Sequence, residues 1–183
     1  MKVVGICGSP RKGNTETLLR EAVNSAKEKG ADTELILLKD KNIKFCDGCL
    51  TCEKTGKCHI NDDMQEIYKK LTQSDAIIFG SPTYYDNVTA LFKNFIDRTN
   101  VFYLNKNLKN KIAAIICVGG MKLYENSIEN AAEQIKIFCK IHGMKVVEKL
   151  LVSATKSNEI SKNKKIINKA RNLGRKIVKS IKK

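Results

Sequence analysis

Four of the seven cysteines lie close together, between Cys46 and Cys58. Cys46, Cys49, Cys52 and Cys58 form the pattern C-x2-C-x2-C-x5-C. Three thiolates spaced three positions apart in a folded-back loop can surround one cube-shaped iron-sulfur cluster, and iron-sulfur proteins use the related run C-x2-C-x2-C-x3-C-P. Here the fourth gap is longer, the proline is missing and there is no second set of cysteines. The spacing predicts one 4Fe-4S cluster whose four ligands are all local.

Zinc and disulfide bonds are the alternatives for these cysteines. Structural zinc sites generally use two C-x2-C pairs separated by a longer spacer. Here Cys49 is shared by two C-x2-C steps, which suits a cubane better than a tetrahedron. An odd number of cysteines in a chain expected to be cytoplasmic argues against a disulfide framework. Phe45, Gly48 and Leu50 are candidates for shielding a cluster from water, whereas His59 is expected to be an ordinary exposed histidine.

A second candidate site is the loop from Gly8 to Thr15, GSPRKGNT. It follows a short apolar run (Val3, Val4, Ile6, Cys7) and precedes apolar residues at helical spacing (Leu18, Leu19, Ala22, Val23, Ala26). A buried strand that leads through a loop of small residues into a helix makes an anion site, because free backbone N–H groups and the positive end of the helix dipole converge there. The sequence therefore predicts a phosphate at this loop.

The kind of phosphate follows from two incomplete matches. The loop differs from the triphosphate loop G-x-x-x-x-G-K-[ST] at Asn14, which stands where a lysine reaches the β and γ phosphates. The dinucleotide pattern G-x-G-x-x-G is absent. The remaining polar groups, Ser9, Asn14 and Thr15 with Arg11 alongside, suit one terminal phosphomonoester such as that of FMN. The alternative is an ordinary strand-to-helix turn capped by Asn14 or Thr15.

A third candidate site is the segment Ser81 to Asn87, SPTYYDN. Pro82 stiffens the turn, hydroxyls and main-chain amides can hydrogen-bond the polar edge of a flavin ring, and Tyr84 or Tyr85 can cover its face. The alternative is a tyrosine pair packed into a loop at the edge of a sheet. Beside a loop for a single phosphate, the flavin is favoured.

Strands that alternate with helices are needed to bring these loops together. Apolar runs predict five strands, at 3–7, 33–38, 75–80, 111–118 and 145–152. Helical periodicity predicts a helix that ends near residue 29, helices that begin near 63 and 88, and two more over 128–138 and 158–183. This alternation predicts a three-layer α/β fold with a parallel sheet in the order 2-1-3-4-5 and ligands at the carboxyl ends of the strands. We expect one domain over residues 1–183, with the cysteine segment 44–60 inserted after the second strand.

The formal net charge of +15, from 34 Lys and Arg against 19 Asp and Glu, permits an anionic partner, nucleic acid or only a lysine-rich surface. No basic stretch is interleaved with aromatic residues, so we expect a solvated surface and no nucleic-acid partner. No apolar run approaches the roughly 18 residues that span a bilayer, and the start of the chain reads as a core strand. We expect a soluble cytoplasmic protein without membrane contact, in which Cys7, Cys117 and Cys139 are small buried hydrophobes.

Taken together, these segments resemble the iron-sulfur flavoproteins, relatives of the NAD(P)H-dependent FMN reductases in the flavodoxin-like superfamily. The resemblance covers nearly the whole chain and is carried by GSPRKGNT, by GSPTYYDNVTALFKNFIDR and by the cysteine run. One departure is Gly119-Gly120-Met121, which stands after the fourth strand where many flavin reductases carry Gly-Gly-Ser. Contacts to the pyrimidine edge of a flavin are expected to differ there.

The resemblance implies a flavodoxin-like electron-transfer oxidoreductase with two cofactors. It implies FMN held by Ser9, Arg11, Asn14 and Thr15 at its phosphate and by Pro82, Thr83, Tyr84, Tyr85 and Gly119 near its ring, and a 4Fe-4S cluster on Cys46, Cys49, Cys52 and Cys58. It also implies a homodimer or a dimer of dimers and a ferredoxin-like electron donor. The alternatives are an NAD(P)H-dependent FMN or quinone reductase without a cluster, and a zinc-stabilised basic module that binds nucleic acid.

Overall fold

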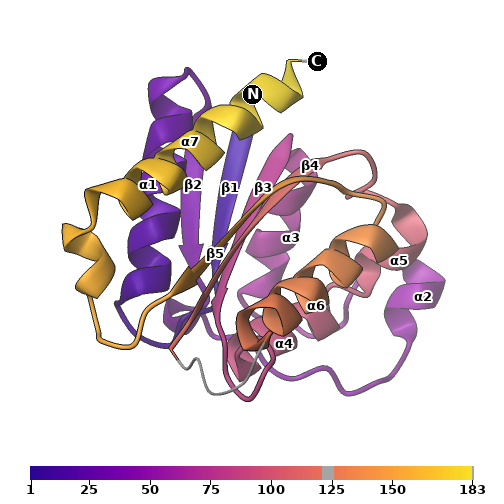
Figure 1. Ribbon diagram of the computed structural model, residues 1–183. Coiled ribbons are helices and arrows are strands. Elements are labelled where there is room, and N and C mark those ends of the chain that lie inside the picture. The colour runs from indigo at the N-terminus through magenta and orange to yellow at the C-terminus, as the bar shows by residue number, and fades with distance from the viewer. Residues whose placement is uncertain (121–125, 183) are drawn as a thin grey trace.

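Five parallel strands form one sheet in the order β2-β1-β3-β4-β5, which confirms the predicted fold and strand order. The computed structural model of the chain describes residues 1–120 and 126–182. The strands are β1 (Lys2–Cys7), β2 (Asp32–Leu37), β3 (Ala76–Pro82), β4 (Ile112–Gly119) and β5 (Lys145–Ser153). Helices lie on both faces of this sheet, which gives the three layers seen in Figure 1.

The central strands β1, β3 and β4 are buried on both faces, as their continuous apolar sequences require. Because successive side chains point to opposite faces of a sheet, neighbouring residues belong to different clusters. Ile77 and Phe79 pack into the core on one face, and Ala76 and Ile78 pack into the core on the other. Each face of the sheet therefore has its own hydrophobic core.

Helices α1 (Asn14–Glu28) and α7 (Lys164–Ile181) cover one face and lie against each other. Gly174 allows this close approach, because a Cβ atom there would lie 2.0 Å from the carbonyl oxygen of Ala22. The Ser25 hydroxyl donates a 2.8 Å hydrogen bond to the Arg171 carbonyl oxygen across the same contact. This helix pair holds the start of α1, and the loop before it, at the carboxyl edge of the sheet.

Helices α3 (Met64–Gln73), α4 (Ala90–Arg98) and α6 (Ser127–Ile141) cover the opposite face. Their core contains several phenylalanines packed edge to face. The ring centroid of Phe79 lies 5.5 Å from that of Phe138 and 6.1 Å from that of Phe92. Edge-to-face pairs of this kind add to the stabilisation from burial alone, so α4 and α6 are firmly seated.

Short elements complete the fold: η1 (Leu38–Asp40), α2 (Thr51–Thr55), α5 (Val101–Asn105) and η2 (Glu159–Lys162). The sequence did not predict α2 or α5, and α2 buries none of its residues. Two predicted helix starts are too early, by two positions for α4 and by six for α7, because polar caps decide where these helices begin. The α4 helix begins after Thr89, whose side chain accepts from the Phe92 N–H, and α7 begins after Asn163, whose side chain accepts from the Ile166 N–H.

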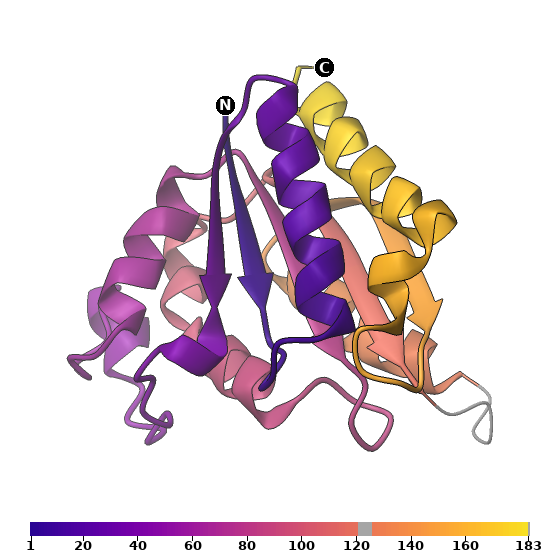
Figure 2. The same ribbon diagram turned by 90° about the vertical axis from the view of Figure 1, so that its left-hand side faces the viewer.

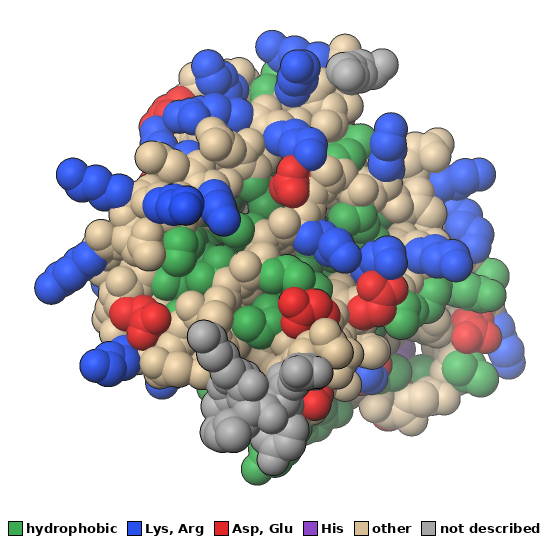
Figure 3. Space-filling model, in the orientation of Figure 1, with side chains coloured by type: hydrophobic (Ala, Val, Ile, Leu, Met, Phe, Trp, Pro, Cys, Tyr) green, Lys and Arg blue, Asp and Glu red, His purple; other side chains and the backbone are tan. Residues whose placement is uncertain are grey.

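The three cysteines outside the cysteine segment are buried hydrophobes, as predicted. Burial raises the pKa of Cys7 to about 11 and the pKa of both Cys117 and Cys139 to about 12. On the face shown in Figure 3, Lys and Arg side chains are dispersed among polar and apolar ones. Among the described residues, no helix combines the length and the apolar character needed to cross a membrane.

Candidate functional site

The three candidate segments are all attached to the carboxyl edge of the sheet. In Figure 2 this is the lower edge, where the β1–α1 loop, the β3–α4 loop and the cysteine segment (residues 44–60) emerge from the strand ends. Gly8 and Gly80 stand side by side there, since the Gly8 N–H donates a 2.8 Å hydrogen bond to the Gly80 carbonyl oxygen. Parallel strands place their carboxyl ends together, so the topology itself gathers these loops.

The β1–α1 loop has the features of an anion site. The N-cap of α1 is Gly13, and no side chain caps the helix, so the alternative of a turn capped by Asn14 or Thr15 is wrong. Among the described residues, the backbone N–H groups of Asn14, Thr15 and Glu16 have no acceptor. The loop is shaped by Ser9, whose hydroxyl donates to the Arg11 carbonyl oxygen at 2.7 Å. Free N–H groups at the start of a long helix are what a phosphate requires.

The Asn14 side chain is engaged elsewhere. Its Nδ2 atom donates to the Lys156 carbonyl oxygen at 2.9 Å, and its Oδ1 atom accepts from the Ile160 N–H at 3.3 Å. These two bonds connect the first turn of α1 to the loop between β5 and α7. The structure therefore gives the Asn14 side chain a positioning role at this site, and leaves its backbone N–H group without an acceptor among the described residues.

A small cavity of about 120 Å³ joins the β1–α1 loop to the loops after β3 and β4. It brings together Ser9, Arg11, Asn14, Thr15, Pro82, Thr83, Tyr84 and Gly119, which are eight of the nine residues predicted to bind a cofactor. Within residues 1–120 and 126–182, the buried hydroxyl of Thr83 has no hydrogen-bond partner. A Cβ atom on Gly119 would come within 3.4 Å of that hydroxyl and 2.5 Å of Ile128. An unpaired hydroxyl beside a position without a side chain fits a ligand that accepts or donates a hydrogen bond there.

The ninth predicted residue, Tyr85, lies at the tip of a tight turn. Tyr84 and Asn87 exchange backbone hydrogen bonds of 2.9 and 3.0 Å, and Tyr85 and Asp86 between them have positive φ angles of 48° and 58°. Tyr85 is fully exposed and Tyr84 is 45% exposed, so the alternative of a packed tyrosine pair is wrong. A cavity of about 120 Å³ is smaller than ordinary ligand pockets, so most of a flavin would lie on the surface beside these rings. Met121 lies outside the described residues.

The cysteine segment is largely exposed. Cys46 and Cys49 are exposed, whereas Cys52, on α2, and Cys58 are half-buried. Phe45 is 79% exposed and Leu50 is 53% exposed, so the expectation that they shield the cysteines from water is wrong for this chain by itself.

Two residues beside the cysteines contact each other through their side chains. His59 Nε2 lies 2.8 Å from Asp47 Oδ2, and Asp47 Oδ1 accepts a 3.2 Å hydrogen bond from the Cys49 N–H. Hydrogen bonds from Cys49 and from His59 lower the pKa of the Asp47 carboxyl group. His59 is exposed, as predicted, but it is not isolated.

Over the ranges that the structure describes, the four cysteines are not gathered closely enough to form a site for a single ion. Among the described residues, one group of three ligand atoms lies close enough for a single ion, Asp47 with Cys49 and His59, and it contains only one of the four cysteines. Each cysteine of a cubane binds a different iron, so its sulfur atoms stand farther apart than the ligands of one ion. Four thiols are the donor set of a 4Fe-4S cluster and also of a structural zinc site, so the donor set fits the predicted cluster without by itself excluding zinc.

A larger cavity of about 620 Å³ lies between the cysteine segment and helices α4, α5 and α6. Cys46 forms part of its wall, and so does Asn87 at the end of the β3–α4 loop. Its wall also contains exposed apolar side chains, including Phe45, Tyr103 and Ile141, together with polar and charged ones such as Lys93 and Asp97. The first predicted cluster ligand and the aromatic loop therefore border the same hollow.

Sequence reasoning missed two residues that contact the cysteines. Arg98 Nη2 lies 3.5 Å from the sulfur of Cys58, and Asn100 Nδ2 lies 3.5 Å from the sulfur of Cys52. Arg98 follows Cys58 by 40 positions, and Asn100 follows Cys52 by 48. No spacing rule connects residues so far apart, and Arg98 reads in the sequence as the basic last residue of an amphipathic helix.

The sheet order, the helix N-terminus after β1 and the aromatic loop after β3 define the flavodoxin-like class of mononucleotide-binding proteins. A solved flavodoxin from the domain Archaea has the same fold, with a TM-score of 0.66 and 19% identity, over the full length of both chains. At that identity the likeness concerns the fold alone.

Comparison by sequence finds relatives with higher identity to this chain than that flavodoxin. The profile of the family described as NADPH-dependent FMN reductase matches residues 1–159. The chain is 44% identical over 148 residues to an iron-sulfur flavoprotein of Methanocaldococcus jannaschii, covering 80% of this chain and 76% of that one. It is 39% identical over 150 residues to an iron-sulfur flavoprotein of Methanosarcina thermophila, covering 80% and 77%. The chain belongs to the iron-sulfur flavoproteins of the NADPH-dependent FMN reductase family and is a flavin-dependent oxidoreductase.

Proposed function

We propose that this protein is an electron-transfer oxidoreductase that carries FMN and one 4Fe-4S cluster and passes electrons from a ferredoxin-like donor to an acceptor. The observation that supports the proposal is that Cys46 and Asn87, the last residue of the segment 81–87 after β3, border one cavity. When bound, the cluster exchanges one electron at a time and the flavin exchanges two, so the pair couples one-electron delivery to two-electron reduction. The seven free thiols suit the reducing cytoplasm, where we place this reaction.

The FMN site consists of groups at three loops. The N–H groups at the start of α1, the Thr15 and Ser9 hydroxyls and the Arg11 guanidinium hold the phosphate, with Asn14 fixing the helix turn. The Thr83 hydroxyl and the backbone at Pro82 and Gly119 bind the remainder of the ligand, and Tyr84 and Tyr85 cover the ring. Cys46, Cys49, Cys52 and Cys58 ligate the cluster.

Anaerobic purification followed by iron, sulfide and flavin analysis tests the proposal. We expect about four iron and four sulfide per chain, with an FMN spectrum and a low-temperature EPR signal on reduction. Replacing Cys46 by serine is expected to lower the iron content while FMN is retained. The matched control is Cys139→Ala, which removes a fully buried thiol on α6 and is expected to leave the iron content unchanged. A protein that holds neither chromophore after reconstitution would refute the assignment.

A second function is favoured by the family match, namely NAD(P)H-dependent reduction of FMN or a quinone without use of the cluster. Rapid bleaching of the flavin by NAD(P)H, at the same rate in wild type and Cys49→Ala, would establish it. Bleaching by a reduced ferredoxin, abolished in Cys49→Ala, would establish the electron-transfer function.

We also propose a homodimer that uses the surface beside the cysteine segment. Phe45, Tyr103 and Ile141 are 79%, 48% and 54% exposed and border one cavity. Apolar patches that are exposed on one chain commonly mark an interface, and a two-fold interface uses the same patch twice. Sedimentation should give a dimer for the wild type and a monomer for Ile141→Glu. A wild type that sediments as a monomer at all concentrations would contradict this.

A further inference from the structure

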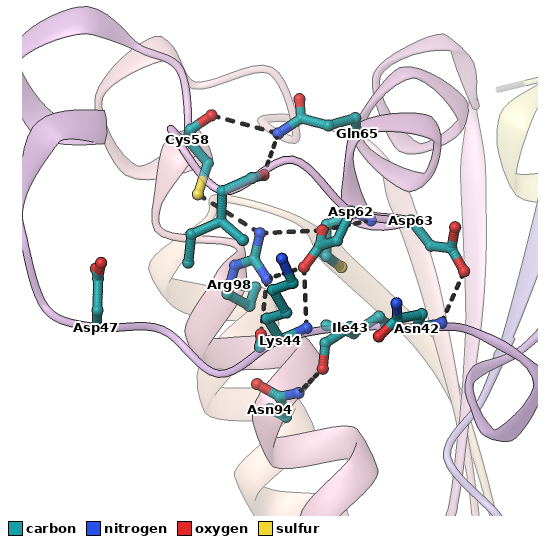
Figure 4. A network of polar contacts seen from close by, with 12 residues as sticks. Asn42, Ile43, Lys44, Asp47, Cys58, Asp62, Asp63, Gln65, Asn94 and Arg98 are labelled. Carbon is teal, nitrogen blue, oxygen red and sulfur yellow. Dashed lines mark hydrogen bonds and ion pairs between the residues drawn. The ribbon is translucent and has the colours of Figure 1, made fainter.

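A buried ion pair lies directly behind the cysteine segment. Arg98 is the last residue of α4, and Asp62 lies two residues before the start of α3. Both side chains are 0% exposed, and Arg98 Nη1 lies 2.5 Å from Asp62 Oδ2. Figure 4 shows the two side chains facing each other, with Cys58 on the far side of the guanidinium. Taking two charges out of water costs free energy, so stability alone does not explain why Arg98 and Asp62 are buried together.

The pair connects the two ends of the cysteine segment. Arg98 Nη1 donates to the Lys44 carbonyl oxygen at 2.7 Å, and Asp62 Oδ2 accepts from the Lys44 N–H at 2.9 Å. One turn earlier on α4, Asn94 donates to the Ile43 carbonyl oxygen at 2.9 Å. On the exit side, Asp63 accepts from the Asn42 N–H at 2.7 Å. Residues 42–44 and 62–63 are thereby fixed to each other and to α4 by the protein's own hydrogen bonds.

Two donors from the end of α4 then reach sulfur atoms. Arg98 Nη2 lies 3.2 Å from Asp62 Oδ1 and 3.5 Å from the Cys58 sulfur. Just beyond the helix, Asn100 Nδ2 lies 3.5 Å from the Cys52 sulfur and 3.2 Å from Glu53 Oε1. The half-buried cysteines, Cys52 and Cys58, are the two that receive these donors. No other N–H···S contact to the four cysteines is present among the described side chains.

We propose that Arg98 and Asn100 are positioning residues that set the reduction potential of the cluster by donating hydrogen bonds to the thiolates of Cys58 and Cys52. This inference rests on the proposed function. Hydrogen bonds to cysteine sulfur disperse negative charge, and reduction adds one electron to the cluster, so such bonds favour the reduced form. The Arg98 charge acts in the same direction, and Asp62 fixes the orientation of the guanidinium fork.

A purely structural role predicts a different pattern. If Arg98 and Asp62 only connected the loop ends, replacing both by apolar residues would leave the potential unchanged once the protein had folded and loaded iron. Asn100 distinguishes a structural role from a role in setting the potential, because it lies outside the ion pair. Its side chain is half-buried, so the Asn100→Ala protein is expected to fold normally.

The experiment is an anaerobic redox titration of the holoprotein, followed by EPR for the cluster and by visible absorbance for the flavin. At a fixed applied potential, Asn100→Ala is expected to raise the ratio of oxidised to reduced cluster about threefold. The double variant Arg98→Met/Asp62→Leu, which leaves no unpaired charge, is expected to shift it by about tenfold, or 59 mV lower for a one-electron couple. Arg171→Met on α7, which breaks an ion pair with Glu28 on the other face of the sheet, is the control and should leave the potential unchanged.

Each outcome decides a separate question. A wild type without iron overturns the proposed function, and this inference with it. A wild type with a cluster, and an Asn100→Ala protein whose cluster potential equals that of the wild type, overturns this inference alone. If the double variant loads no cluster, Asn100→Ala alone decides. A lowered cluster potential with an unchanged FMN potential supports the inference.

Discussion

The hydroxyl of Thr89 donates a 2.6 Å hydrogen bond to the carbonyl oxygen of Gly8. Thr89 is the N-cap of α4, and Gly8 is the first residue after β1, so this bond joins the β1–α1 loop to the helix that follows the aromatic loop. The contact needs glycine, because a Cβ atom on Gly8 would lie 2.6 Å from the Phe92 ring. Two loops that sequence analysis treats separately are thus one unit.

Thr89→Val is expected to loosen that unit. Valine keeps the shape of threonine but removes the bond to Gly8 and the cap on the Phe92 N–H. We expect the free energy of unfolding to fall by about 2 kcal/mol, from a lost helix cap and a buried carbonyl without a partner. Urea denaturation measures this, and Thr89→Ser, which keeps both bonds, should retain most of the stability. Equal stability of the valine and wild-type proteins would show that the bond contributes nothing.

Thr83→Val is expected to have opposite effects on folding and on binding. The buried Thr83 hydroxyl has no partner in the part of the chain that the structure describes. Removing it relieves an unsatisfied polar group and should leave the apoprotein as stable as the wild type or more stable, by up to about 1 kcal/mol. If this hydroxyl bonds FMN, the same change should weaken FMN binding about tenfold, equivalent to 1.4 kcal/mol. Quenching of flavin fluorescence measures the affinity. Unchanged FMN affinity would remove Thr83 from the site.

The fold and most of the site follow from local sequence, and the remaining parts depend on contacts between distant segments. Continuous apolar runs identified every strand to within a few residues, because central parallel strands are buried on both faces. The starts of α4 and α7 were predicted two and six positions too early, because hydrogen-bonding caps at Thr89 and Asn163, and not hydrophobic spacing, set them. The Arg98 contact with Cys58 joins residues 40 positions apart, and only the folded chain brings them together.

Acid is expected to destabilise the start of α1 through Glu16. Burial disfavours the Glu16 carboxylate, but ion pairs with Lys39 at 2.9 Å and Arg20 at 2.8 Å outweigh burial and lower its pKa. Because the folded-state pKa lies below the unfolded value, this stabilisation is fully present above about pH 4.5 and is lost as the pH falls through the folded-state pKa. Urea denaturation from pH 6 down to about pH 3 should show a smaller loss for Glu16→Gln than for the wild type. Parallel curves would exclude Glu16 as a source of the acid sensitivity.

Asn14→Ser is expected to weaken flavin binding by loosening the backbone around the site, and not by removing a contact with the phosphate. The Asn14 side chain bonds the Lys156 carbonyl oxygen and the Ile160 N–H, and serine is too short to reach both. Hydrogen exchange in residues 156–160 should therefore quicken in the apoprotein, before any ligand is added. If instead the amide contacts the phosphate directly, exchange should stay unchanged in the apoprotein and the variant should lose affinity for FMN but not for riboflavin. A positioning role predicts weaker binding of both flavins, because the start of α1 and the cavity shared with Thr155 move together.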